Sequence, residues 1–183
     1  MTTERAPTSW VGWKERGQRY YSQKNFRGAL KAFEECLNPI CECPQSQHHL
    51  ILSNIVACRL QLPVNDENSL ENAISEAQRC VQLQPTWSKG YIRLASAYSR
   101  AKQSNLACQA LQTALRYDPQ HPTARQMLVR ELNRDRHEQR TNGTSPSGGN
   151  DINPLDDDLD DFDPPPRRHQ TATTSFWTNL STW

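Results

Sequence analysis

The sequence predicts an all-α protein, a solenoid of three antiparallel helical hairpins with a C-terminal capping helix and a disordered acidic tail. One observation is an internal repeat, because Ala73 recurs as Ala107, 34 residues further along the chain. Pro85 and Pro119 are separated by the same number of residues. A second observation is that apolar residues recur with helical spacing over most of the chain. A fixed period of this length is typical of stacked hairpins that bury their apolar faces against one another.

The first hairpin is predicted over residues 10–37. Its first segment, residues 10–23, has aromatic residues at helical spacing and a small residue where a neighbouring helix would approach: Trp10, Trp13, Gly17, Tyr20 and Tyr21. After a turn at Lys24 and Asn25, an apolar stripe from Phe26 to Leu37 predicts a second helix. We expect that helix to stop near Pro39, because proline removes a backbone donor.

Two further hairpins and a cap follow. Residues 48–60 are apolar almost all round, which predicts a helix in the middle of the stack, and residues 70–83 are amphipathic after a polar turn at residues 63–69. The third hairpin, residues 87–101 and 103–117, has the cleanest pattern. Pro122 begins a seventh helix with an apolar face and an arginine-rich face, as the end of an open stack requires.

The charge is divided between a basic body and an acidic tail. Residues 141–183 hold seven Asp and two Arg, a net charge of −5, which leaves +6 for residues 1–140 out of the total of +1. The tail begins with a Gly/Ser/Asn-rich linker and has too few apolar residues to order itself. The predicted organisation is a flexible N-terminus at 1–9, a repeat domain at 10–139 (repeats at about 10–43, 46–86 and 87–120, cap at 121–139), and a disordered tail at 140–183.

Composition and motifs argue against several classes of protein. No run of 18 apolar residues and no signal-like N-terminus is present, so we expect a cytoplasmic or nuclear protein with reduced cysteines and no membrane partner. No phosphate loop, nucleophile elbow or base-reading motif is present, so we expect no enzymatic activity, no cofactor and no nucleic-acid partner. A cluster of thiols and imidazoles does not match a zinc spacing, and we expect no metal there: Cys36, Cys41, Cys43, His48 and His49. Three further cysteines occupy packing positions: Cys58, Cys80 and Cys108.

The strongest candidate site is the stretch from Gln84 to Arg93. Lys89 and Arg93 are four residues apart, so both cations project from one face of the predicted helix, one turn apart. Paired cations are often only a solvated face. Here they lie at the joint of the repeat, where a groove would run, and they are suited to hold an anion.

The chain resembles the tetratricopeptide-repeat family over residues 10–139, and within it the carboxylate-clamp co-chaperones typified by the first repeat domain of the heat-shock organising protein. Repeat three is nearly a full match to the family pattern, through Tyr91, Leu94, Ala95, Tyr98, Ala107, Leu111, Ala114 and Pro119. Two positions depart from it, since Cys41 stands where proline is usual and Arg59 where an aromatic residue is usual. The resemblance implies a peptide-binding groove.

The family's clamp pattern also occurs in this chain. Its three elements are Lys14-Glu15-Arg16-Gly17-Gln18, then Ser53-Asn54, then Lys89-Gly90-Tyr91-Ile92-Arg93. The resemblance implies that Lys14, Gln18 and Asn54 hold the terminal carboxylate of a peptide ending Glu-Glu-Val-Asp, while Lys89 and Arg93 engage the last Asp side chain and the nearby backbone. Gln18 replaces the usual Asn, and freezing its extra rotatable bond costs up to about 1 kcal/mol.

The expected function is that of a monomeric, non-enzymatic adaptor for the C-terminus of a 70-kDa or 90-kDa heat-shock chaperone. Two alternatives are a repeat scaffold for a non-chaperone partner and a regulatory fragment of a larger enzyme. The tail has three readings: a competitor for the basic groove, a second docking motif through the aromatic residues at 176–183, and a solvating linker.

Overall fold

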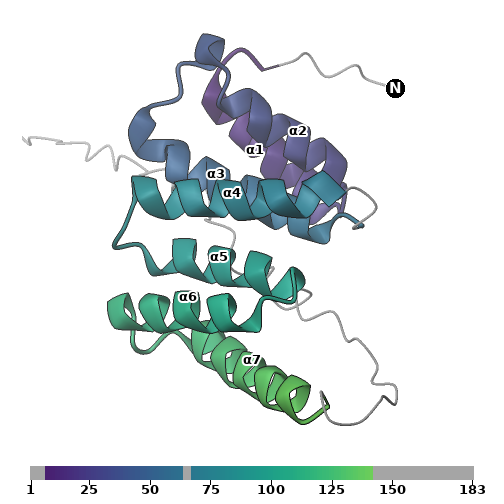
Figure 1. Cartoon of the computed structure of the whole chain (residues 1–183). Coiled ribbons are helices and arrows are strands. Elements are labelled where there is room, and N and C mark those ends of the chain that lie inside the picture. The colour runs from purple at the N-terminus through teal and green to yellow at the C-terminus, as the bar shows by residue number, and fades with distance from the viewer. Residues whose placement is uncertain (1–6, 64–66, 142–183) are drawn as a thin grey trace, which may run out of the picture.

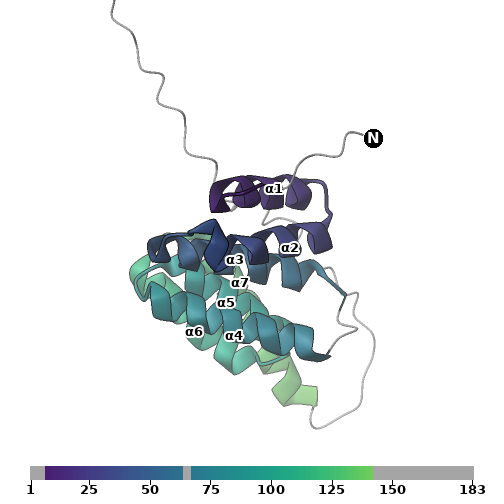
Figure 2. The same cartoon turned by 90° about the horizontal axis from the view of Figure 1, so that it is seen from above.

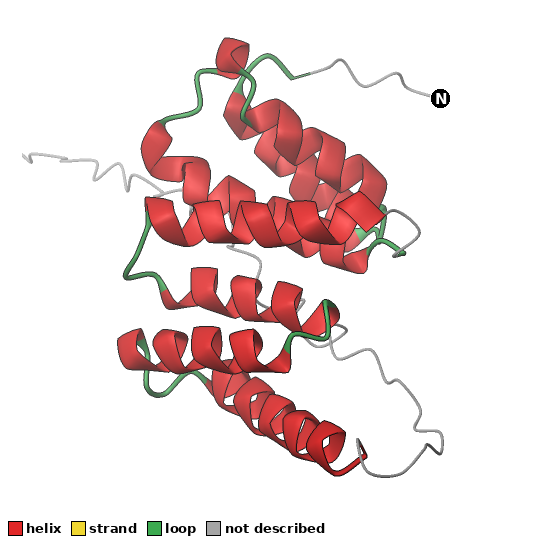
Figure 3. Cartoon of the chain, viewed as in Figure 1, coloured by secondary structure: helices red, strands yellow, loops and turns green. Residues whose placement is uncertain are grey.

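The computed structural model describes residues 7–63 and 67–141, and all regular elements in these ranges are helical (Figure 3). The elements, in chain order, are α1 Trp10–Ser22, α2 Phe26–Cys36, the short 3-10 helix η1 Pro39–Cys41, α3 Gln45–Gln61, α4 Glu67–Leu83, α5 Ser88–Arg100, α6 Ser104–Tyr117 and α7 Pro122–Thr141. In this part of the chain no helix is long and apolar enough to cross a membrane.

The helices pack as antiparallel hairpins that stack in chain order. α1 packs on α2, α3 on α4 and α5 on α6, while α7 closes the stack against α6 (Figure 1). Seen from above, α1 lies at the outer edge of the stack, beside α2 (Figure 2). The predicted all-α solenoid with a capping helix is therefore confirmed. The limits assigned to the repeats remain predictions. Of the tail predicted at 140–183, residues 140 and 141 belong to α7, and residues 142–183 lie outside the described ranges.

Two helices begin earlier than the apolar pattern predicted. α3 begins at Gln45 rather than His48, and α4 at Glu67 rather than Leu70. The added residues are polar first turns, which give no periodic apolar signal. At α3 the extended backbone of Pro44 (φ −60°, ψ 138°) forms the N-cap, so the proline that ends the preceding loop also starts the helix.

Hairpins one and three turn in the same way. Lys24 and Lys102 both have φ 57°, the left-handed conformation, directly after the C-caps of α1 and α5. In each turn the lysine N–H donates to the carbonyl three residues back, and the following N–H to the carbonyl five residues back. Both turns are thus Schellman motifs that satisfy the last carbonyls of the helix, with lysine where glycine is usual.

The core consists of two clusters of buried residues that share α3. One cluster takes Val56 and Leu60 from α3 and the other takes Ile51 and Ile55. This division explains why α3 is apolar almost all round. Between α1 and α2, a Cβ on Gly17 would lie 2.7 Å from the ring of the fully buried Phe33, so only glycine allows this approach.

Arg59, which departs from the family pattern, joins three helices. Its Nη2 lies 2.9 Å from a carboxylate oxygen of Glu34 on α2, and its Nε lies 2.8 Å from Glu76 on α4. Burial raises the pKa of the Glu76 carboxyl, and the hydrogen bond and positive charge of Arg59 partly offset that rise. An ion-pair network therefore stands where the family has an aromatic contact.

Candidate anion-binding site

The α3 side of the site consists of polar residues on an otherwise apolar helix. Ser53 and Asn54 are only 6% and 7% exposed, and both line a pocket between α3 and α5. They follow directly on Ile51 and Leu52 in a run of buried residues. Two consecutive polar side chains in such a run are costly unless something hydrogen-bonds them.

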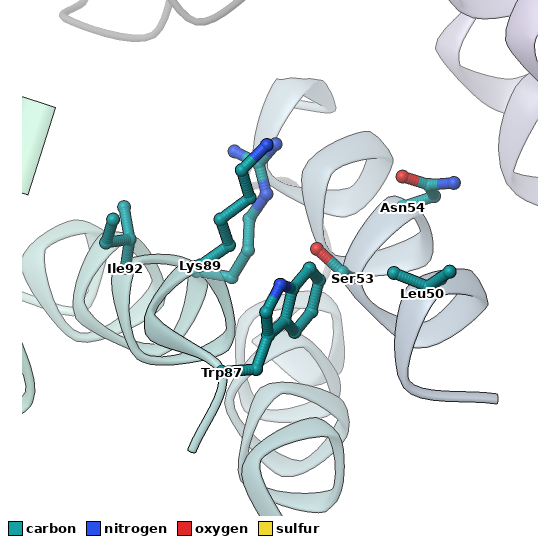
Figure 4. Close-up of a pocket in the computed structure, with 7 residues that line it drawn as sticks. Leu50, Ser53, Asn54, Trp87, Lys89 and Ile92 are labelled. Carbon is teal, nitrogen blue, oxygen red and sulfur yellow. The ribbon is translucent and has the colours of Figure 1, made fainter. Parts of the chain in front are cut away.

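The α5 side supplies two cations and an aromatic ring. Lys89 and Arg93 lie on α5, and Trp87 is the N-cap residue of that helix. Figure 4 shows Lys89 extending from α5, and Ser53 and Trp87 facing one another between the two helices. The full pocket lining is Leu50, Ser53, Asn54, Trp87, Lys89, Ile92 and Arg93. The first turn of α5 has no acidic residue, so the positive end of its dipole adds to the two cations.

Three polar side chains of this pocket, Ser53, Asn54 and Arg93, have no hydrogen-bond partner among the described residues. Arg93 is 8% exposed, yet it forms no ion pair and no hydrogen bond with any residue that the structure describes. Within the same ranges the side chains of Ser53 and Asn54 also have no hydrogen-bond partner. Buried polar groups are rarely left in this state. A buried guanidinium beside a hydroxyl and an amide can donate several hydrogen bonds to one carboxylate.

Within residues 7–63 and 67–141, no carboxylate pairs with Arg93. The charge of Arg93 acts on the thiols of Cys58 and Cys80, and lowers the pKa of each. Burial raises the pKa of each thiol to about 12, and Arg93 only partly offsets that rise. Both thiols are therefore neutral at physiological pH and do not offset the charge of Arg93.

The structure brings together three of the five residues predicted for the site. Asn54, Lys89 and Arg93 line the pocket, whereas Lys14 and Gln18 lie on α1 and are not among the lining residues. Lys14 lies near the thiols of Cys36 and Cys43. Burial raises the pKa of both thiols, and the charge of Lys14 lowers them. A ligand that touched all five residues would have to extend from the α3–α5 pocket to α1.

Four lining residues were not among the predicted site residues. Ser53 precedes Asn54 in the motif, while Leu50, Trp87 and Ile92 form the apolar part of the wall. The ring of Trp87 is held edge-on to His49 on α3, with the ring centroids 5.0 Å apart. The sequence offered a signal for two of them, Ser53 as part of the Ser53-Asn54 element and Trp87 as an aromatic residue two positions before Lys89. Leu50 and Ile92 are apolar residues on helices, and the sequence does not distinguish a residue that lines a pocket from one that packs in the core.

The cysteines are all free thiols. Five of the six are buried, including Cys58, Cys80 and Cys108, which confirms their predicted packing role. Cys36 donates a weak hydrogen bond, 3.4 Å long, to the carbonyl of Trp10, and so helps to join α2 to α1. Within residues 7–63 and 67–141, no group of three or more His, Cys, Asp or Glu side chains is arranged to hold a metal ion.

The stacked hairpins, with a polar pocket between the first helices of two of them, define a helical-repeat protein. Residues 88–121 match the family model described as tetratricopeptide repeat. Residues 88–121 therefore form a tetratricopeptide repeat, in agreement with the resemblance that the sequence shows most clearly in this segment.

Curated relatives and solved structures match a larger part of the chain. Protein STIP1 homolog of Dictyostelium discoideum is 28% identical over 106 residues, 58% of this chain and 17% of that protein. Heat shock protein STI1 of Saccharomyces cerevisiae is 27% identical over 116 residues, 63% of this chain and 18% of that protein. The first TPR of Spaghetti (RPAP3), solved with HSP90 peptide SRMEEVD, has a TM-score of 0.60 at 16% identity and covers 70% of this chain and 96% of that one. The chain thus spans less than a fifth of the length of these curated relatives.

Proposed function

We propose that this domain is a co-chaperone adaptor module that binds the C-terminal peptide of a 70-kDa or 90-kDa heat-shock chaperone in the cytoplasm. The observation that carries the proposal is the buried Arg93, which has no protein partner in the described ranges and lines one pocket with Asn54 and Lys89. The likeness to the domain solved with SRMEEVD, and to the heat-shock protein STI1, supports the choice of ligand.

The chemistry of such a peptide fits the pocket. A chain that ends in aspartate presents two carboxylates within a few ångström, and donors must converge from several directions to hold both. Asn54, Lys89 and Arg93 supply an amide, an ammonium and a guanidinium at one end. We assign Lys14 and Gln18 to the other side of the groove, where they complete a five-residue clamp, and the wall of Leu50 and Ile92 to the aliphatic residue before the terminus.

Calorimetric titration of the full chain with an acetylated SRMEEVD peptide tests the proposal, with the same peptide amidated at its C-terminus as control. Losing one charge-assisted contact of about 1.5–3 kcal/mol weakens binding about 10- to 150-fold, so amidation and Lys89→Ala should each have an effect of this size. Lys102→Ala, an exposed lysine in the α5–α6 turn, is the matched control and should bind as the wild type does.

Equal binding of the free-acid and amidated peptides would refute the clamp. No binding of either peptide would exclude these chaperones as partners and leave a repeat scaffold with a different ligand. Loss of binding in Lys14→Ala, with Lys102→Ala unaffected, would extend the site from the pocket to α1.

A further inference from the structure

The outer face of α7 is an exposed stripe with apolar residues at its centre and cations at its ends. Val129 and Leu132 are 59% and 44% exposed, among the most exposed large apolar residues of the described chain. Arg125 and Arg136 are exposed on either side of them, and the four positions follow the i, i+4, i+7, i+11 spacing of one helix face. As α7 is the last helix of the stack, no described helix covers this face (Figure 1).

Within the described ranges, the two arginines have no acidic partner. The Nε of Arg125 donates to the carbonyl of Pro119 at 2.8 Å, and neither Arg125 nor Arg136 forms an ion pair with a residue that the structure describes. The inner face of α7 differs, because there Arg134 lies 3.4 Å from the buried Glu131, which also accepts a 2.7 Å hydrogen bond from Ser99. Arg125 and Arg136 thus have no carboxylate partner in the described ranges, whereas Arg134 on the inner face is paired with Glu131.

The chain carries a segment with the complementary pattern a short distance beyond α7. Residues 155–163 hold six Asp and three apolar residues, Leu155, Leu159 and Phe162, spaced i, i+4, i+7. Thirteen residues rich in Gly, Ser and Asn separate this segment from Thr141, the end of α7. A linker of that composition and length has a root-mean-square span of about 20 Å. Arg125 lies about 24 Å and Arg136 about 8 Å along the helix axis from Thr141, so the segment can reach the stripe.

We infer that residues 155–163 dock on the outer face of α7, with their apolar side chains on Val129 and Leu132 and their aspartates on Arg125 and Arg136. The contact is intramolecular, and it covers an apolar patch at the open end of the solenoid, where a further repeat would otherwise stack. It also removes the acidic segment from competition for the pocket between α3 and α5. The inference does not depend on the chaperone ligand.

The expected population of the docked form follows from the length of the linker between α7 and residues 155–163. A short flexible linker gives an effective concentration of about 1 mM, so even an intrinsic affinity on the order of 0.2 mM makes the docked form about fivefold more populated than the free form. Ion pairs at an exposed surface are screened by salt, and the population should fall as ionic strength rises. Solution NMR of the full chain can follow both sides of the contact.

The main test compares amide resonances of residues 155–163 in the wild type and in Arg125→Glu/Arg136→Glu. The double variant should move these resonances to the positions seen at high salt. Arg27→Glu/Arg79→Glu changes the net charge equally at exposed positions on α2 and α4, and should leave them unchanged. Unchanged resonances in the first variant, or equal changes in both, would overturn the inference.

Variants on the other side of the contact distinguish docking on α7 from docking elsewhere. Leu159→Ser/Phe162→Ser should shift the methyl resonances of Val129 and Leu132, and Asp157→Arg/Asp161→Arg should restore docking in the α7 charge-reversal variant. If Lys89→Ala frees the segment while the α7 variant does not, the segment occupies the pocket and the inference is wrong. Dependence of the shifts on protein concentration would show docking between copies and would also overturn it.

Discussion

Replacing Arg93 by methionine should stabilise the unliganded protein and weaken ligand binding. A buried guanidinium without an ion pair raises the free energy of the folded state, because its charge has left water without compensation. Methionine keeps the length of the side chain and removes the charge. Arg93 is 8% exposed and has no carboxylate partner in the described ranges, so Arg93→Met removes a cost and breaks no pair.

The magnitudes follow from the surroundings of the side chain. Exchanging a buried charge for a packed apolar group stabilises by about 1–3 kcal/mol, toward the lower end here because the pocket is open to solvent on one side. The same change removes charge-assisted hydrogen bonds to a carboxylate and should weaken binding of the SRMEEVD peptide about 10- to 150-fold. The two effects therefore have opposite signs.

Arg59→Met is the matched control. Arg59 is 17% exposed and paired with Glu34 and Glu76, so its loss leaves the Glu76 carboxylate without a partner. We expect about 1–3 kcal/mol of destabilisation and unchanged peptide affinity. Urea unfolding followed by far-UV circular dichroism gives the stabilities, and calorimetry gives the affinities. If Arg93→Met loses stability as Arg59→Met does, the charge is compensated in the free protein and the reasoning fails.

Three further changes test the fold. Gly17→Ala should lower the free energy of unfolding in urea by up to about 2 kcal/mol, because the clash of the new Cβ with the Phe33 ring costs more than the higher helix propensity of alanine gains. A variant as stable as the wild type would show that the ring moves. Lys102→Gly should stabilise by about 0.5–1 kcal/mol by relieving the φ of 57°, and a loss would mean that unfolded-state entropy dominates. Stability should also fall from pH 9.0 toward 12, since unfolded thiols ionise while the three buried thiols hold their protons. Each thiol should lower the free energy of unfolding by about 1.4 kcal/mol per pH unit in this range. Replacing any one of them by alanine should remove the contribution of that thiol to the pH dependence: Cys36, Cys58 and Cys80.

The helices could be predicted from the sequence because each one buries a periodic apolar face. The beginnings of α3 and α4 were predicted too late, because the first turns of both helices are polar and add nothing to the apolar pattern. Asn54, Lys89 and Arg93 could be placed from motif spacing because they lie on neighbouring first helices of the repeat. The roles of Ser53 and Trp87 depend on which neighbour each side chain faces, and that is decided by packing between hairpins.

Arg59 shows a different limit. It departs from the family pattern, and no motif in the sequence indicates what replaces the aromatic contact. Its two acidic partners lie 25 residues before it and 17 residues after it, on helices that meet only in the stack. Long-range ion pairs of this kind have no periodicity in the sequence, so they can be identified only once the fold is known.

The sharing of α3 between the two core clusters bears on how the domain unfolds. A repeat array in which each unit touched only its neighbours could fray from either end in small steps. Here the halves cannot separate without exposing apolar residues on opposite sides of the same helix. Unfolding should therefore be more cooperative at the centre than at α1 or α7. Because Ser53 and Asn54 lie on α3, a ligand held there would restrain the one helix whose opening couples both halves.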